Sequence, residues 1–158
     1  MRITIAALFA AAFGIVTPAP GDEKKAEAKG TLMLDGKNYN LANALAYETT
    51  MFDKKWTVIY LSEKPLDTSK LKASFKKKGT DEDFFAVAPH VKLMFDDQGK
   101  LFQLALYAAG SNVILQGDPN IKAEATLRDG AAKGMAKTIK PDKDYTFEVT
   151  FDVKLIKP

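Results

Sequence analysis

The sequence predicts an all-β protein with one short helix, in which about nine antiparallel strands form a meander closed, or nearly closed, into a β-barrel. A β-sandwich is the alternative. Apolar and polar residues alternate along much of the chain, which is typical of half-buried strands. Tight-turn signals and short connections link successive stretches, so neighbouring strands are antiparallel. An open sheet of this size would leave long unpaired edges, and closure removes them.

The first 21 residues have the pattern of a signal peptide. Arg2 precedes a run of apolar and small residues over positions 3–16, and Pro18 and Pro20 then break any helix. A bilayer span needs about 18 to 20 apolar residues, so this run is too short to remain as an anchor. We therefore expect an exported protein, periplasmic or extracellular, with no stable membrane span after cleavage.

Residues 22–29 are charged and lack large apolar side chains, so they predict a disordered tether before a single β-rich domain over 30–158. The chain contains no cysteine, which excludes disulfides, thiolate metal ligands and thiol nucleophiles. Its formal net charge is only +3, and the basic residues are spread out, which argues against nucleic acid as a partner.

Strands are predicted near residues 31–35, 38–49, 54–62, 91–96, 101–108, 111–117, 121–128 and 131–139. Asp35-Gly36 and Asp129-Gly130 favour two-residue hairpin turns, because such turns need positive φ angles that glycine tolerates best. The strands at 121–128 and 131–139 present small residues on one parity. These small side chains either allow close packing or leave interior room for a ligand.

The last predicted strand shows the strongest alternation. Its apolar parity holds Tyr145, Phe147, Val149, Phe151, Val153 and Leu155, which predicts one long half-buried strand. Residues 65–79 differ, because they contain helix formers, Asp67 or Ser69 as an N-cap, and Gly79 at the end. We expect a short helix there that covers the sheet's edge or one mouth of the barrel.

Five residues are candidates for lining a binding site: Trp56, Tyr60, Phe84, Phe85 and His90. Trp56 and Tyr60 share one strand parity, and Phe84-Phe85 lie in the longest irregular stretch, where they either plug the core or form an apolar rim. His90 is the only histidine, so with no cysteine the chain lacks a zinc ligand set. We predict no metal, no cofactor and no catalytic residues.

Two acidic clusters raise the alternatives of a calcium site or an acid/base pair, and the sequence argues against both. Asp81-Glu82-Asp83 and Asp96-Asp97 bring carboxylates together, as calcium sites and acid/base pairs require, but neither has the spacing of a known metal loop. A solvated loop and a hairpin turn, respectively, explain them better. No serine lies in a nucleophile-elbow context, so the sequence predicts a protein that is not an enzyme.

The opening hairpin carries a family resemblance. Residues 30–47 show a G-x-L-x-x-D-G-K-x-Y-x-L pattern, and Leu61-Ser62-Glu63-Lys64-Pro65-Leu66 is similar to an L-S-D-K-P-L pattern. Together they resemble a family of exported bacterial β-rich domains. The resemblance implies export and a β-rich fold, and it brings no activity or site residues with it.

These features predict a non-catalytic β-barrel module that binds a small apolar or amphipathic ligand within the barrel or at its mouth. The alternative is an envelope structural or protein-interaction domain, in which an exposed strand or the Phe84-Phe85 tip docks an envelope protein.

Overall fold

The computed structural model describes residues 27–51, 53–69, 71 and 88–156, and it confirms that the protein is all-β. The described strands are β1 (Glu27–Leu34), β2 (Lys37–Leu41), β3 (Asn43–Met51), β4 (Lys54–Ser62), β5 (His90–Phe95), β6 (Leu101–Ala108), β7 (Ser111–Leu115), β8 (Ile121–Arg128), β9 (Ala131–Thr138) and β10 (Tyr145–Ile156).

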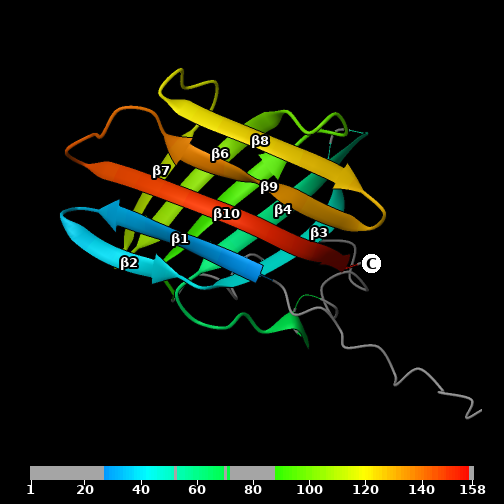
Figure 1. The fold of residues 1–158 in the computed structure, drawn as a ribbon, viewed down its shortest axis with the longest axis horizontal. Helices are drawn as coiled ribbons and strands as arrows, with labels where there is room; N and C mark the ends of the chain where they lie inside the picture. The colour runs from blue at the N-terminus through cyan, green and yellow to red at the C-terminus, as the bar shows by residue number, and fades with distance from the viewer. Residues whose placement is uncertain (1–26, 52, 70, 72–87, 157–158) are drawn as a thin grey trace, which may run out of the picture.

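The strands form two halves that lie over one another as layers, with the strands of one layer crossing those of the other in the view of Figure 1. One half has the order β2-β1-β10-β9-β8, and the other has the order β3-β4-β5-β6-β7. The two halves join at the end of β10, where Leu155 and Ile156 pair in parallel with Ala46 and Tyr47 of β3. Strand β10 therefore connects the layers into one ten-stranded sheet.

The sheet is not closed, so the closed barrel is not confirmed. Within the described ranges, β7 pairs only with β6, and β8 pairs only with β9. A short loop over 116–120 joins β7 to β8, but the two strands belong to opposite halves. Only part of the topology is a simple meander, because β10 lies between β1 and β9.

The structure also changes the predicted boundaries at the start of the fold. The single strand expected over 38–49 is two strands, because the chain crosses at Ala42 from β2 in one half to β3 in the other. There the Ala42 amide donates to the Ser62 carbonyl of β4 at 3.1 Å. Strand β1 begins at Glu27, since residues 27–29 of the expected tether pair with β10. Residues 1–21 and 22–26 lie outside the described residues.

The main core lies between the two layers. As the alternation predicts, Phe147, Val149, Phe151 and Val153 of β10 are buried, while Glu148, Thr150 and Lys154 are exposed. The ring centroids of Phe151 and Phe95 on β5 are 6.2 Å apart, which joins the two layers directly. The small residues Ala132 and Ala136 of β9 are fully buried in this core, so here they serve close packing.

Only the beginning of the predicted helix is described. Thr68, Ser69 and Leu71 are helical, and the Ser69 amide donates to Asp67 Oδ1 at 3.0 Å, as expected for an Asp67 N-cap. Leu71 is fully buried in a second apolar cluster, which lies on the outer face of the β3–β7 half. This turn of helix thus packs on a sheet face, where we expected it at an edge or a mouth.

Candidate functional site

Strand β4 is buried on both faces. All residues from Trp56 to Ser62 are buried, and alternate side chains go to different clusters. Ile59 and Leu61 join the main core, whereas Val58 and Tyr60 join the second cluster on the outer face. The outer face of this half is therefore packed with apolar and aromatic side chains, although an outer sheet face is ordinarily polar.

Aromatic rings form a row across four adjacent strands of this face. The Tyr47 ring on β3 stacks near the Tyr60 ring on β4 with centroids 6.4 Å apart. The Tyr60 ring lies 5.5 Å from the imidazole of His90 on β5, and the imidazole lies 5.2 Å from the Tyr107 ring on β6. Such separations lie within the range of favourable aromatic contacts. We call these four residues the aromatic row.

A groove of about 390 Å³ adjoins the aromatic row and is lined by side chains from all five strands of this half. Its position follows from the register around Ala105 on β6, which pairs with Lys92 on β5 and with Ile114 on β7. Gln103 and Tyr107 flank Ala105 along its own strand. Because alanine is the smallest of these side chains, the surface is hollow over it. We call this hollow the outer groove.

Polar atoms are placed among the aromatic rings. His90 Nδ1 lies 2.8 Å from the Ala88 carbonyl oxygen. A carbonyl can only accept, so Nδ1 carries the proton in this bond. The Lys92 ammonium lies 5.6 Å from the centroid of the Tyr60 ring, in a cation–π contact. Gln103 and Asn112 also line the outer groove, so amide donors and acceptors lie beside its apolar surface.

The structure brings together two of the five predicted site residues. Tyr60 and His90 touch each other and line the outer groove. Trp56 lies on the same face, where its Nε1 donates to the Met51 carbonyl at 3.1 Å and its ring lies 4.5 Å from Phe102. Phe84 and Phe85 lie outside the described residues.

Sequence reasoning missed Tyr47, Tyr107 and Lys92. One signal was available, because residues 56–62 of β4 lack the alternation of a half-buried strand and so predict burial on both faces. That burial would have directed attention to the outer face of the neighbouring strands.

Two other hollows are weaker candidates for the functional site. One of about 260 Å³ lies at the open side between β7 and β8, and its lining includes Leu104, Leu115 and Ile121 as well as Lys100 and Asp118. It combines few polar groups with no aromatic ring.

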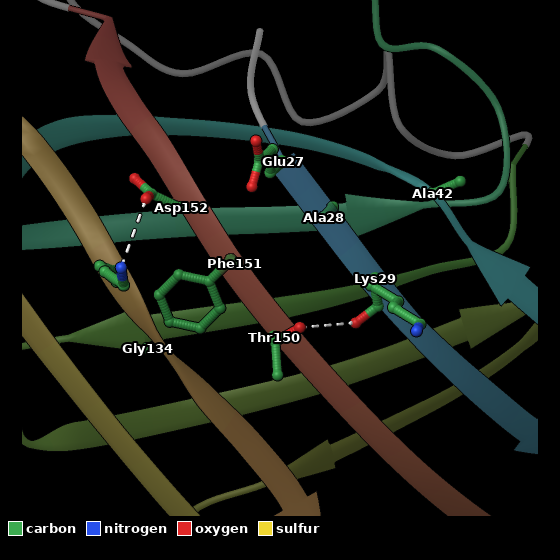
Figure 2. A pocket seen from close by; sticks show the side chains of 9 residues that line it. Glu27, Ala28, Lys29, Ala42, Gly134, Thr150, Phe151 and Asp152 are labelled. Atoms are coloured by element: carbon green, nitrogen blue, oxygen red, sulfur yellow. Dashed lines mark hydrogen bonds and ion pairs between the residues drawn. The ribbon is translucent and has the colours of Figure 1, made fainter. Parts of the chain in front are cut away.

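The other hollow, of about 730 Å³, lies over β1, β9 and β10 and is shown in Figure 2. There Thr150 Oγ1 donates to the Lys29 carbonyl at 3.3 Å, and Lys133 Nζ lies 3.6 Å from Asp152. Phe151 is the aromatic residue among the described residues of its lining, which also includes the charged residues Glu27, Lys29, Lys133 and Asp152. We therefore place the candidate site at the outer groove, although this hollow is larger.

The acidic cluster Asp96-Asp97 stabilises a turn. Asp96 Oδ1 accepts hydrogen bonds from the amides of Gln98 (3.0 Å) and Lys100 (2.8 Å), so the turn interpretation of Asp96-Asp97 is confirmed. Asp81 to Asp83 lie outside the described residues. Among the residues described, no three histidine or acidic side chains are grouped to hold a metal ion, and no helix is long and apolar enough to cross a membrane.

Comparison with protein families, with curated proteins and with solved structures gives no match. The resemblance of the opening hairpin to exported β-rich domains therefore stays a prediction, and function must be argued from the geometry of the outer groove.

Proposed function

We propose that the protein is an exported, non-catalytic binding module that holds a small amphipathic ligand in the outer groove. The observation that carries this proposal is the aromatic row beside a hollow lined by polar groups, on a sheet whose opposite face already forms the core. Ligand sites combine an apolar surface with a few placed polar groups, and volumes of about 300 to 1,000 Å³ are usual. The outer groove, at about 390 Å³, falls within that range.

Side chains fill the space between the two layers. This favours a site in the outer groove over the interior site that we expected from a barrel. Eighteen buried residues form the core cluster between the layers, and most of them are completely inaccessible. We further propose that the two layers act as a sandwich whose interior is reserved for packing. The ligand's apolar part would then lie on Tyr107, Met51 and Ile114, and its polar part near Gln103 and Asn112.

The experiment fills the outer groove and asks whether a ligand is lost. The full chain, expressed in its own host, is purified as wild type and as Ala105→Trp, and retained small molecules are identified by native mass spectrometry. Ala105 forms the groove floor, so the tryptophan side chain should lower the retained ligand at least tenfold. The matched control is Thr126→Trp, an exposed position on β8 in the other half, which should retain the ligand.

Two results would overturn the proposal. One is equal retention of the ligand by Ala105→Trp and wild type, with both proteins folded by circular dichroism. The other is a wild-type protein that carries no ligand and binds no added aromatic probe.

A second candidate function is the docking of an envelope protein on this same face. Three large apolar side chains here are exposed: Met51 (39%), Phe102 (41%) and Ile114 (57%). Met51 and Ile114 line the outer groove, and Phe102 contacts Trp56 on the same face. Exposed apolar side chains that gather on one face are typical of interaction surfaces.

Cross-linking in intact cells distinguishes the two functions. If the face docks a protein, Phe102→Ser, at an exposed position outside the lining of the outer groove, should abolish a specific cross-linked partner while leaving small-molecule retention unchanged. A cross-linking pattern that Phe102→Ser does not alter would count against docking.

A further inference from the structure

We infer that the protein forms a two-fold symmetric dimer in which strand β7 of one copy pairs antiparallel with β7 of a second copy. This inference goes beyond the proposed function and does not depend on it, because it concerns the edge of the sheet and not the binding of a ligand.

Strand β7 is an outer strand whose edge lacks the usual protection. Among the strands that the structure describes, β2, β7 and β8 each pair on one side only. Native proteins protect such edges with charged side chains, proline or a bulge, because the unpaired N–H and C=O groups otherwise pair with another chain. Strand β8 carries Lys122, Glu124 and Arg128, and β2 begins at Lys37. Strand β7 contains no charged residue and no proline, and its register with β6 is continuous.

The absence of charge extends through the whole β6–β7 hairpin. No lysine, arginine, aspartate or glutamate occurs from Leu101 to Gly117, although 27% of the residues in the chain are charged. Two identical edges bring identical side chains together, so like charges oppose the self-association of a charged edge strand. Such repulsion is absent at β7, which makes this edge electrostatically compatible with a second copy of itself.

The free backbone groups of β7 also match those of a second copy. The two-residue turn over 109–110 makes the residues on either side of it a hydrogen-bonded pair, and hydrogen-bonded and non-hydrogen-bonded pairs then alternate along the hairpin. The amides and carbonyls of Asn112 and Ile114 therefore point away from β6. If two copies pair antiparallel about an axis at Val113, Asn112 of each copy faces Ile114 of the other, and all of these outward groups are satisfied.

The side chains of β7 suit the same pairing. On the outer face, Ile114 is 57% exposed and would be partly covered by Asn112 of the second copy. On the inner face, Val113 packs against the main core and would meet Val113 of the second copy. Because β7 has only 5 residues, the interface is small, and the dimer should form in a concentration-dependent way.

A cysteine at the symmetry axis tests the pairing. The chain has no cysteine of its own, so each variant introduces its one thiol. In the dimer the two 113 positions form a directly opposed pair with Cβ atoms about 4.5 to 5.5 Å apart, whereas the two 114 positions lie diagonally, about 7 to 8 Å apart. Under mild oxidation, full-chain Val113→Cys should therefore form a disulfide-linked dimer about tenfold faster than Ile114→Cys. The matched control is Thr126→Cys, at an exposed position on β8, which should cross-link no faster than Ile114→Cys.

Sedimentation velocity measures the association without a cross-link. Wild type should pass from monomer to dimer as its concentration rises. Ile114→Glu should weaken the dimer about tenfold, because the two new carboxylates lie near the axis and repel each other. Adding Asn112→Lys to Ile114→Glu should restore the dimer, since each new ammonium then faces a carboxylate of the second copy. Thr126→Glu adds a carboxylate to the outer strand β8 and should associate as wild type does.

The outcomes separate the dimer from the proposed function, because Val113 does not line the outer groove. If wild type stays monomeric at every concentration, or if Val113→Cys cross-links no faster than Thr126→Cys, the dimer is overturned while ligand binding in the groove stands. A dimer that Ile114→Glu leaves at full strength would use another surface, and it would overturn the pairing through β7.

Discussion

The imidazole of His90 on β5 lies between two tyrosine rings, 5.5 Å from Tyr60 on β4 and 5.2 Å from Tyr107 on β6. Its Nδ1 donates to the Ala88 carbonyl at 2.8 Å, so the one histidine of the chain is held by two kinds of interaction at once. Two substitutions at this position separate them.

His90→Phe keeps the ring contacts and loses the Nδ1 donor, so it should lower the free energy of unfolding by about 1 kcal/mol. His90→Asn can keep a donor at the same place but loses both ring contacts, each worth about 0.5 to 1.5 kcal/mol. Urea unfolding of the two variants and of wild type measures how much free energy the Nδ1 hydrogen bond and the ring contacts each contribute. If neither variant is less stable than wild type, the His90 contacts do not stabilise the fold.

The alternation in β10 predicts the cost of truncating its core side chains. Phe147 is 1% exposed and packs in the main core, so Phe147→Ala should cost about 3 to 5 kcal/mol of unfolding free energy. Glu148→Ala, on the adjacent exposed position, should cost less than about 0.5 kcal/mol. Denaturant titration of both variants checks the assignment, which a loss below 1 kcal/mol for Phe147→Ala would refute.

Gly134 on β9 predicts a different kind of loss. A Cβ added there would clash first with the Glu124 carbonyl oxygen, and it would lie 2.9 Å from both the Ala125 Cα and Phe151 Cζ. Gly134→Ala should therefore cost about 1 to 3 kcal/mol through overpacking, in spite of the usual preference for alanine over glycine in a strand. Because a backbone atom is among the contacts, the double variant with Phe151→Leu should recover only part of the loss in thermal unfolding. If Gly134→Ala instead raises the free energy of unfolding, β9 can move away from its neighbours β8 and β10 without cost.

Tyr145 predicts a loss of stability at alkaline pH. Burial raises the pKa of the Tyr145 phenol above its ordinary value of 10.0, and the hydrogen bond it donates to Asp118 at 3.0 Å raises the pKa further. A raised pKa in the folded state means that the folded protein holds this proton more tightly than the unfolded chain. The resulting stability is fully present below pH 10.0 and is lost as the pH rises through the folded pKa.

Tyr145→Phe should remove this part of the pH dependence. We therefore expect wild type to lose more unfolding free energy than Tyr145→Phe between neutral pH and a pH well above 10.0, measured by urea titration at each pH. Parallel curves for the two proteins would contradict the expectation.

Much of the fold could be predicted because its signals are local. The alternation in β10 and the glycine turns depend on neighbouring residues, and the structure confirms them. The crossing at Ala42 could not be predicted in this way. Leu41 and Leu45 share one parity in the sequence, yet Leu41 joins the main core and Leu45 joins the outer cluster. Asn43 interrupts this parity, but one polar residue does not by itself show that the chain passes from one layer to the other.

The candidate site was only partly predictable for a related reason. The residue types of Tyr60 and His90 drew attention from the sequence alone. The aromatic row, however, depends on the registers of β3, β4, β5 and β6, which bring Tyr47 and Tyr107 to the same line. Those registers are set by pairing between distant segments, and no local pattern encodes them.

The position of β10 also bears on when this fold can form. Strand β10 follows the other nine described strands in the chain, yet it pairs with β1, β9 and β3. During synthesis β1 therefore lacks its inner partner until β10 has been made, and the two layers stay unjoined until then. Pairing between such distant segments is slow, because a long loop must first be closed. A chain that delays its own folding in this way completes its two-layered structure only after its C-terminal strand has been synthesised.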